Sequence, residues 1–492
     1  MDLLQVKGNR IITKDGRPIF LRGTCIGGWM NMENFIDGYP GTESGLREIM
    51  QKTLGFTRGE YFFERLLDYF FDEDDLKFLK NLGVTVVRLP LNYRHFEDDE
   101  HPFEYKEKGF TRLDRALSLC ESAGIYAILD LHAVQGWQNA HWHSDNSRGI
   151  SLFWRNRHFQ DRFVALWEEF ARRYKGRTVV AGYNIMNEPC SNVVPDGDYP
   201  HTFYGTYLSD WERMNRIYRR TVEAIRKIDP NHIIFLEGDM YSHSFNGMEA
   251  PFAENLVYSS HNYNAAGFGP GPYPGEFHTH RPDRQEENGY WDKEKQVEVF
   301  KTQEGTRFSE TYNVPLWIGE FGSQYNGPAE EVPYRLRAME DQIQVFNEFG
   351  AHWTTWTYKD VGVMGLVTLD PDSDYMELIK PVQEKKRILA AENFTNRYAV
   401  SPAKKITEEL ATLIERTVPE IPIHHTSNIL CLNQAALSGY AAAVLLPYYA
   451  SRFTGLSEER LDRVLSSFAF KNCIINKGLA EIFKKECFYA TN

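Results

Sequence analysis

The sequence lacks the motifs of zinc-ribbon, redox and nucleotide-binding proteins. Its six cysteines are scattered and none forms a CxxC pair, which argues against zinc-ribbon and thioredoxin-like proteins. The segment Gly23–Gly28 is rich in glycine, but it has neither the Lys-Ser/Thr of a P-loop nor the spacing of a dinucleotide fingerprint. We therefore expect no nucleotide and no cofactor.

Positive charge is also in short supply. The chain has 55 basic and 68 acidic residues, a net charge of −13, which is a poor basis for gripping nucleic acid or an anionic membrane. The N-terminus has no basic region followed by a long apolar run, so we predict no secretory signal and a cytoplasmic location. The longest apolar stretch, Ala441–Leu446, is followed by Pro447 and is too short to span a membrane.

The composition is that of a soluble globular enzyme or binding protein. Apolar residues make up 42% of the 492 residues and charged residues 25%, both near average values. Aromatic residues are abundant at 14%, which is common where flat ligands are stacked, although a large core uses aromatics too.

Apolar, β-branched segments recur along the first 380 residues and alternate with helical patterns. Runs that are apolar throughout predict strands buried on both faces, and their alternation with helices predicts a parallel sheet. Eight such units fit a (β/α)8 barrel with enlarged loops, and a doubly wound open sheet is the alternative. The predicted strands are Phe20–Thr24, Val84–Leu89, Ile125–Leu131, Val179–Ile185, Ile233–Leu236, Leu256–Ser260, Leu316–Gly319 and Trp353–Thr357.

The predicted helices show apolar residues three and four positions apart. They are Arg65–Leu82, Leu113–Ala123, Phe159–Tyr174, Met214–Ile228, Lys293–Tyr312 and Tyr334–Phe349. Before the first strand, Asp15-Gly16 is a type I′ turn signal and predicts a hairpin. The long segments Asn31–Phe62 and Gly267–Gly289 are predicted as loops, which in a barrel shape the active face.

The pattern changes after residue 396. We predict a catalytic barrel over residues 1–396 and a helical extension over 401–492, with helices at Lys404–Arg416, Gln434–Tyr449 and Leu456–Ser467. The extension shows no alternating strand signal, so a β-sandwich sugar-binding module is not expected. It either packs on the barrel or forms a homo-oligomer interface, and the sequence does not choose between these.

Two glutamates each follow a buried strand. Glu188 comes after the apolar run Val179–Ile185, and Glu320 comes directly after Leu316–Gly319. A charged group at such a place lies at the rim, and the carboxyl-terminal rim of a barrel is where catalytic groups sit. A pair of carboxylates at that rim suits glycoside hydrolysis, in which one protonates the leaving oxygen and the other attacks the anomeric carbon.

Two further residues fit this chemistry. Asn187 offers an amide that can hold a sugar hydroxyl, and Arg88 at the end of the second strand can keep a nearby carboxylate ionised. A purely structural ion pair is the alternative for Arg88.

With these residues in order, residues 10–395 resemble glycoside hydrolase family 5. The resemblance rests on Asn187-Glu188-Pro189 after the fourth strand and Glu320 after the seventh. It implies that Glu188 is the acid/base and Glu320 the nucleophile of a retaining mechanism. It also implies that Asn187 binds the hydroxyl beside the anomeric carbon and that Arg88 supports the nucleophile.

The resemblance extends to residues at other strand ends. His132 matches the histidine after strand three, His261 and Tyr263 match the pair after strand six, and Trp356 matches the sugar platform after strand eight. Tyr263 would hydrogen-bond Glu320. The loop Gly136-Trp137-Gln138-Asn139 resembles that of the family's exo-acting β-glucanases, and Trp29 resembles the same branch, so Trp137, Gln138, Asn139 and Trp29 are candidate substrate-binding or supporting residues.

Two histidine pairs invite a metal hypothesis. His141 and His143, like His278 and His280, are two positions apart, a spacing that can ligate a metal on a strand. Both pairs fall in predicted loops without a matching acidic partner, so we expect no metal.

The leading hypothesis is a retaining, exo-acting β-glycosidase that needs no cofactor. Its substrates would be short oligosaccharides or glycosides with β-linked glucose or mannose. The alternatives are an endo-β-glucanase or transglycosylase with an open cleft, and a non-catalytic sugar-binding barrel. The presence of both Glu188 and Glu320 argues against a non-catalytic barrel.

Overall fold

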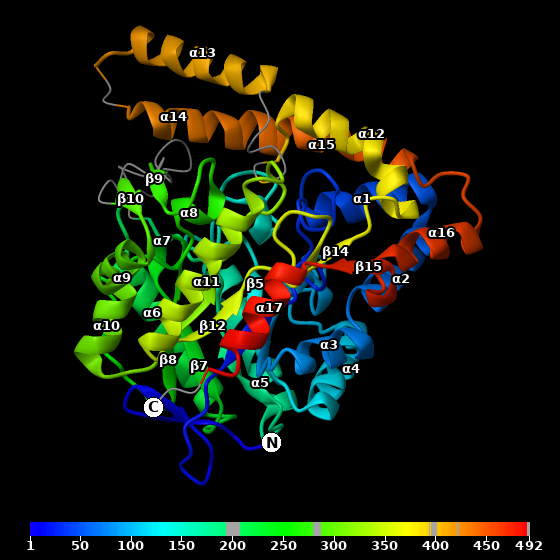
Figure 1. Ribbon diagram of the computed structural model, residues 1–492. Helices are drawn as coiled ribbons and strands as arrows, with labels where there is room; N and C mark the ends of the chain where they lie inside the picture. The colour runs from blue at the N-terminus through cyan, green and yellow to red at the C-terminus, as the bar shows by residue number, and fades with distance from the viewer. Residues whose placement is uncertain (193–206, 279–286, 393, 395–400, 421–422, 490–492) are drawn as a thin grey trace.

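The computed structural model describes residues 1–192, 207–278, 287–392, 394, 401–420 and 423–489. Eight parallel strands close into a barrel in the order β11-β12-β3-β4-β5-β6-β7-β8 (Figure 1). This confirms the predicted (β/α)8 fold and all eight predicted strands. The barrel strands are β3 (Arg22–Cys25), β4 (Val86–Asn92), β5 (Tyr126–Ala133), β6 (Val180–Asn184), β7 (Ile233–Glu237), β8 (Leu256–His261), β11 (Leu316–Glu320) and β12 (His352–Thr355).

Helices surround the barrel, and two of the predicted helices are each split into two. Asp72 caps a new helix start with a capping box, and Gln303 has extended backbone between α9 and α10. The surrounding helices are α2 (Phe56–Phe70), α3 (Glu73–Asn81), α4 (Glu107–Ala123), α5 (Arg157–Tyr174), α6 (Trp211–Arg226), α9 (Lys293–Thr302), α10 (Glu304–Tyr312), α11 (Val332–Glu348) and α12 (Asp374–Leu389).

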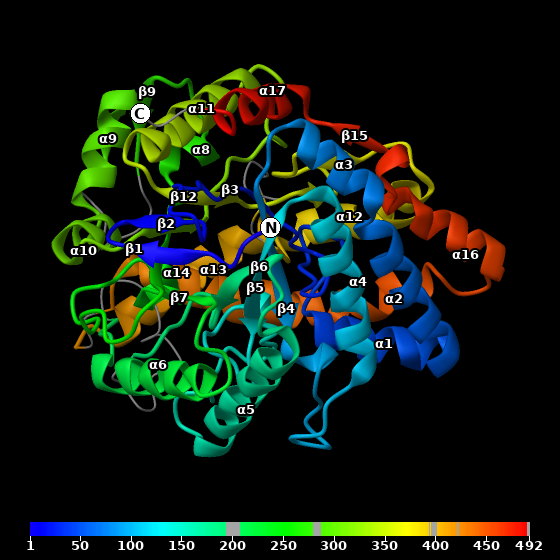
Figure 2. The same ribbon diagram turned by 90° about the horizontal axis from the view of Figure 1, so that it is seen from below.

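The amino-terminal end of the barrel is closed by a hairpin. Strands β1 (Gln5–Lys7) and β2 (Arg10–Ile12) pair across this opening (Figure 2). Leu4 and Ile11 pack with residues from the barrel interior such as Trp317. The tight turn lies at Gly8-Asn9, and the predicted Asp15-Gly16 turn follows as a second turn closed by the bridge between Ile12 and Pro18.

The long segments contain more regular structure than predicted. The helix α1 (Glu43–Leu54) lies within Asn31–Phe62, and β9 (Gly275–Phe277) begins a small sheet with β10 (Gly289–Trp291). Short elements in the other loops are α7 (Asp239–Ser242), α8 (Ala265–Phe268), β13 (Lys359–Asp360) and β14 (Val367–Leu369), with single turns at Tyr93–His95 and Trp142–Ser144.

The carboxyl-terminal segment wraps around the barrel. It comprises α13 (Pro402–Thr417), α14 (His425–Leu432), a π-helical stretch (Asn433–Ala441), α15 (Ala442–Ser451), α16 (Glu458–Leu465), β15 (Cys473–Ile475) and α17 (Lys477–Glu486). The helix α15 packs on α1, α16 packs on α2, and α17 packs on α11 (Figure 1). The strand β15, which the sequence did not predict, pairs antiparallel with β14.

The apolar stretch in this segment is longer than predicted. Residues His425–Ser451 form one continuous helix of 27 residues, which extends the predicted helix Gln434–Tyr449 at both ends and contains Pro447. By length and composition alone this helix could cross a membrane, although core helices of soluble proteins pass the same criterion.

Candidate active site

The candidate catalytic residues meet at the carboxyl ends of the barrel strands. Glu320 is the last residue of β11, His261 ends β8, and Glu188 follows β6 by four residues. Because the strands are parallel, these ends lie at one rim, beneath the helices α13 and α14 (Figure 1). Gly27 lets the first loop pass close to Trp356, because a side chain there would lie within 2.8 Å of the indole ring.

The two glutamates are close enough for a double displacement. A carboxylate oxygen of Glu188 and one of Glu320 lie within 4.8 Å of each other. Retaining glycosidases place their two carboxyl groups about 5 Å apart, whereas inverting enzymes need about 6.5–9.5 Å to admit a water. The spacing therefore favours the retaining mechanism.

Glu320 is held as a carboxylate. Its Oε1 accepts a hydrogen bond from Nη1 of Arg88 at 2.5 Å, and its Oε2 accepts one from the hydroxyl of Tyr263 at 2.9 Å. Burial alone would raise the pKa of Glu320, but the positive charges of His261 and Arg88 outweigh it and lower the pKa. An ionised carboxylate is what a nucleophile requires.

Glu188 has a different environment. Nδ1 of His261 lies 2.7 Å from its Oε1, and Nε2 of His143 lies 3.3 Å from its Oε2. Burial raises the pKa of Glu188, and the negative charge of Glu320 adds to that effect. A raised pKa suits an acid that must hold its proton.

The backbone of Glu188 is fixed by a third carboxylate. The φ angle of Glu188 is 44°, a left-handed value unusual for a residue other than glycine. Its N–H donates to Oε2 of Glu237 at 2.8 Å, and Glu237 in turn lies 3.1 Å from Arg88. The strain at Glu188 is thus offset by a charge-assisted hydrogen bond.

Arg88 organises the floor of the site. Its fully buried guanidinium donates to Oδ1 of Asn187 at 2.7 Å and pairs with Asp130 at 3.1 Å as well as with Glu320. The guanidinium therefore joins β4 to β5, to the segment that follows β6 and to β11.

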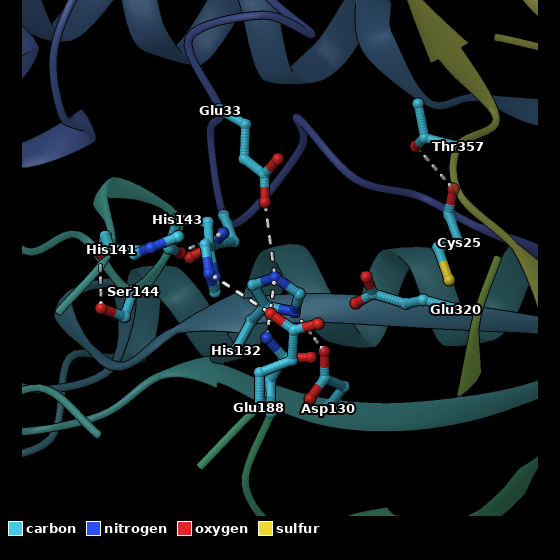
Figure 3. A network of polar contacts seen from close by, with 12 residues as sticks. Cys25, Glu33, Asp130, His132, His141, His143, Ser144, Glu188, Glu320 and Thr357 are labelled. Atoms are coloured by element: carbon cyan, nitrogen blue, oxygen red, sulfur yellow. Dashed lines mark hydrogen bonds and ion pairs between the residues drawn. The ribbon is translucent and has the colours of Figure 1, made fainter. Parts of the chain in front are cut away.

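His132 connects this network to the sugar platform. Its Nδ1 lies 2.7 Å from Asp130, and its ring stacks on Trp356 with centroids 5.2 Å apart. Burial alone would lower the pKa of His132, but Asp130 raises it to about 10. Figure 3 shows His132 between Asp130 and Glu33, with Nε2 of His132 3.4 Å from Oε1 of Glu33.

These residues surround a cavity of about 320 Å³, at the low end of the usual range for small-molecule sites of about 300–1,000 Å³. Both glutamates, His132, Tyr263 and Trp356 line it. Arg88 and His261 bond to the glutamates and Asn187 bonds to Arg88, so eight of the twelve predicted site residues lie together. The other lining residues are Glu33, Phe35, His141, Trp142, His143, Tyr241, His243, Asn264, Ala265, Phe268, His278, Glu287, Met364 and Phe394.

Two predicted sugar-binding tryptophans lie outside this lining. The indole of Trp29 packs on Phe71 in the hydrophobic core and donates to the carbonyl of Leu67 at 3.0 Å. The indole of Trp137 donates to the carbonyl of Asp145 at 2.9 Å. Both were predicted as substrate-binding or supporting residues, and these contacts fit the supporting role.

Gln138 and Asn139 are also turned toward the protein. Gln138 donates to the carbonyls of His132 and Asn187 at 2.7 and 2.9 Å, and Asn139 donates to the carbonyl of Glu188 at 2.9 Å. These amides brace the backbone that carries the candidate catalytic residues. Of the two roles predicted for them, substrate-binding or supporting, these contacts fit the supporting one.

Several site residues escaped the sequence analysis. Glu237 ends an apolar strand just as Glu320 does, so the same signal was present for it. Glu33 and Tyr241 carry no such signal, because they lie in connecting segments whose course depends on tertiary packing. His143 was considered only as half of a candidate metal-binding pair with His141.

The histidine pairs do not form a metal site among the described residues. Within that part of the chain, the one cluster with metal-ligand spacing is Glu188, His261 and Glu320, and it contains neither pair. His141 and His143 line the cavity with ring centroids 5.5 Å apart, and His280 lies outside the described residues.

Comparison with known proteins decides the family. The model of the cellulase family, glycosyl hydrolase family 5, matches residues 61–362. The chain belongs to glycoside hydrolase family 5. It is a β-glycoside hydrolase of the retaining type.

Members of family 5 and related structures match over different shares of this chain. A β-xylosidase from Phanerodontia chrysosporium is 35% identical over 98% of both chains. Cellodextrinase A from Ruminococcus flavefaciens is 29% identical over 54% of this chain and 71% of its own length. A crystal structure of a glycoside hydrolase, 22% identical with a TM-score of 0.50, covers 70% of this chain and 90% of its own, which supports the fold.

Proposed function

We propose that the protein is an exo-acting β-glycosidase that removes single sugars from short glycosides. The observation that carries this is the small cavity, with both carboxylates and the Trp356 platform at its floor. Such a cavity has room for one sugar and part of a leaving group, whereas an endo-acting enzyme needs a longer cleft.

The two glutamates have the roles that their surroundings favour. Glu320 attacks the anomeric carbon and forms a glycosyl ester, while Glu188 gives its proton to the leaving oxygen. Glu188, now a carboxylate, takes a proton from water, and that water attacks the anomeric carbon and releases the sugar with its configuration retained.

The change of role at Glu188 has a physical cause in this site. The negative charge of Glu320 helps to raise the pKa of Glu188. That charge disappears when Glu320 is esterified, so the pKa of Glu188 falls and the residue becomes a base when the second step requires one.

The identity of the sugar is part of the proposal. The resemblance in the motifs fits glucosides or mannosides, and the relative named β-xylosidase, which aligns over nearly the whole chain, adds xylosides. All three are compatible with a platform of indole and a floor of hydrogen-bonding side chains.

Initial rates on nitrophenyl β-glucoside, mannoside, galactoside and xyloside test the proposal, with Glu320→Ala as a control. We expect turnover of at least one monosaccharide glycoside, lost in the control. Turnover of oligosaccharides alone would overturn exo action and support an endo-acting enzyme.

A further inference from the structure

Four aromatic rings that line the cavity form one cluster, which we call the mouth. Phe35, Trp142, Phe268 and Phe394 come from the segment after β3, the loop after β5, the short helix α8 and the crossing between α12 and α13. The ring centroids of Phe35 and Phe394 are 4.7 Å apart, and those of Phe268 and Phe394 are 6.3 Å apart.

Phe394 stands at the centre of this group and is held by its backbone. Its carbonyl accepts hydrogen bonds from Nε2 of Gln324 at 3.1 Å and Nδ2 of Asn326 at 3.2 Å. These bonds fix the backbone of Phe394, and its ring lines the cavity although the residue comes from a segment beyond the last barrel strand.

The wall beside Glu188 is also made of uncharged rings. Burial lowers the pKa of His141 to about 4, and it holds the pKa of His143 well below the usual range. Both imidazoles are therefore neutral near pH 7. The ring centroids of Tyr241 and His141 are 5.0 Å apart. Flat, uncharged rings therefore line the side of the cavity where Glu188 would protonate the leaving oxygen.

A helix without charge lies at the same end of the molecule. The 27 residues His425–Ser451 contain no Asp, Glu, Lys or Arg, although charged residues are 25% of the whole chain. Only 39% of its most apolar window is buried, and Tyr440 and Val444 are 75% and 55% exposed. Solvent-facing helix surfaces are normally charged, so this face calls for an apolar contact.

This helix is attached to the mouth. Nε2 of Gln434 donates to the carbonyl of Ala140 at 3.3 Å, two residues before Trp142. The neighbouring α13 adds Ile406, Leu410 and Leu413, which are exposed and lie at positions i, i+4 and i+7 of one helix face.

We propose that the leaving-group site is apolar and that the enzyme cleaves β-glycosides of alkyl or aryl alcohols. The sugar lies on Trp356, the apolar aglycone lies against Phe35, Trp142 and Phe394, and a longer chain continues along the exposed face of His425–Ser451. This inference rests on the proposed exo action. The net charge of −13 and the absence of basic residues in the helix fit a neutral chain rather than an anionic lipid.

An alkyl series provides the test. We would measure kcat/KM for methyl to octyl β-glycosides of the preferred sugar, below their micelle concentrations, beside the disaccharide of that sugar. The alcohols leave with nearly equal intrinsic ability, so a rise with chain length reports binding. A fully buried methylene raises kcat/KM about fourfold. From the methyl to the octyl glycoside we expect kcat/KM to rise by at least about tenfold.

Variants locate the gain. Phe394→Ala should lower the ratio of kcat/KM for the octyl glycoside to that for the methyl glycoside, and Phe488→Ala, at an exposed phenylalanine remote from the mouth, should leave this ratio unchanged. Val444→Lys should reduce the gain for the longest chains only, with Ile474→Lys on β15 as the matched surface control.

The outcomes separate this inference from the proposed function. Turnover of the methyl glycoside with a flat alkyl series, and a better disaccharide, would overturn the apolar site and leave exo action standing. A rise with chain length that survives Phe394→Ala would exclude the ring cluster, and a gain unaffected by Val444→Lys would remove the helix from the site.

Discussion

The floor and the mouth of the cavity are built on different principles. The floor consists of charged and hydrogen-bonded side chains at strand ends, centred on Arg88, Glu188 and Glu320. The mouth consists mostly of uncharged rings from connecting segments, such as Phe35 and Phe394, and includes a residue from beyond the barrel. The proposed chemistry therefore rests on the barrel, whereas the proposed selection of the leaving group rests on the segments around it.

A second contrast lies within the floor itself. Glu188 and Glu320 carry the same functional group, and both are largely buried. Glu320 is paired with Arg88 and its pKa is lowered, whereas burial and the charge of Glu320 raise the pKa of Glu188 despite its contact with His261. Their surroundings thus favour the ionised form of the proposed nucleophile and the protonated form of the proposed acid.

The strongest way to break this contrast is to remove the nucleophile. Glu320→Ala should lower kcat by about 10⁴-fold or more, because the carboxylate that is proposed to attack the anomeric carbon is removed. Steady-state rates on the best nitrophenyl glycoside measure this, and retained binding of the sugar, followed by calorimetry, shows that the fold survives. A loss below tenfold would contradict the assignment.

Removal of the acid should depend on the leaving group. Glu188→Ala should lower the rate of the first step by about 10²–10⁴-fold for an alkyl glycoside. The same variant should lose far less with a dinitrophenyl glycoside, whose leaving oxygen needs no proton. Pre-steady-state bursts on the two substrates compare these steps. Equal losses on both would show that Glu188 is not the acid.

The shared neighbour His261 allows both pKa values to be moved together. Burial alone would lower the pKa of His261, but Glu320 and Glu237 raise it to about 10, so it is positive at neutral pH and lowers the pKa of both Glu188 and Glu320. His261→Gln removes that charge and should raise both carboxyl pKa values.

The direction in which the pH profile of His261→Gln should move follows from the proposed roles of Glu188 and Glu320. Activity requires ionised Glu320 and protonated Glu188, so the acid limb and the basic limb of the kcat/KM profile should both move to higher pH, by about one unit. His352→Gln, at a buried histidine near the opposite end of the barrel, should leave the profile in place. A shift of the limbs in opposite directions would contradict the shared electrostatic effect.

The floor was predictable from the sequence because the same local signal marks each of its parts. An apolar run that ends in Glu188 or Glu320 places a carboxylate at the rim of any parallel barrel, and the order of strands brings the two together. The mouth was not predictable, because Phe394 and Glu33 reach it only through the path of the chain between elements. The C-terminal helices were predicted as a group, but the helix predicted over Gln434–Tyr449 begins earlier, at His425, and ends at Ser451.

Trp29 shows where motif resemblance and packing diverge, and it sets the smallest expected effect. Trp29→Phe should lower the free energy of unfolding by about 1–3 kcal/mol, because the smaller ring leaves a void and the carbonyl of Leu67 loses its buried donor. KM should stay within about twofold, since the indole lies outside the cavity lining. Trp356→Phe, at a tryptophan that lines the cavity, should raise KM instead. Denaturant unfolding and steady-state kinetics on both variants separate the two roles, and a large rise in KM with Trp29→Phe would restore Trp29 to the sugar site.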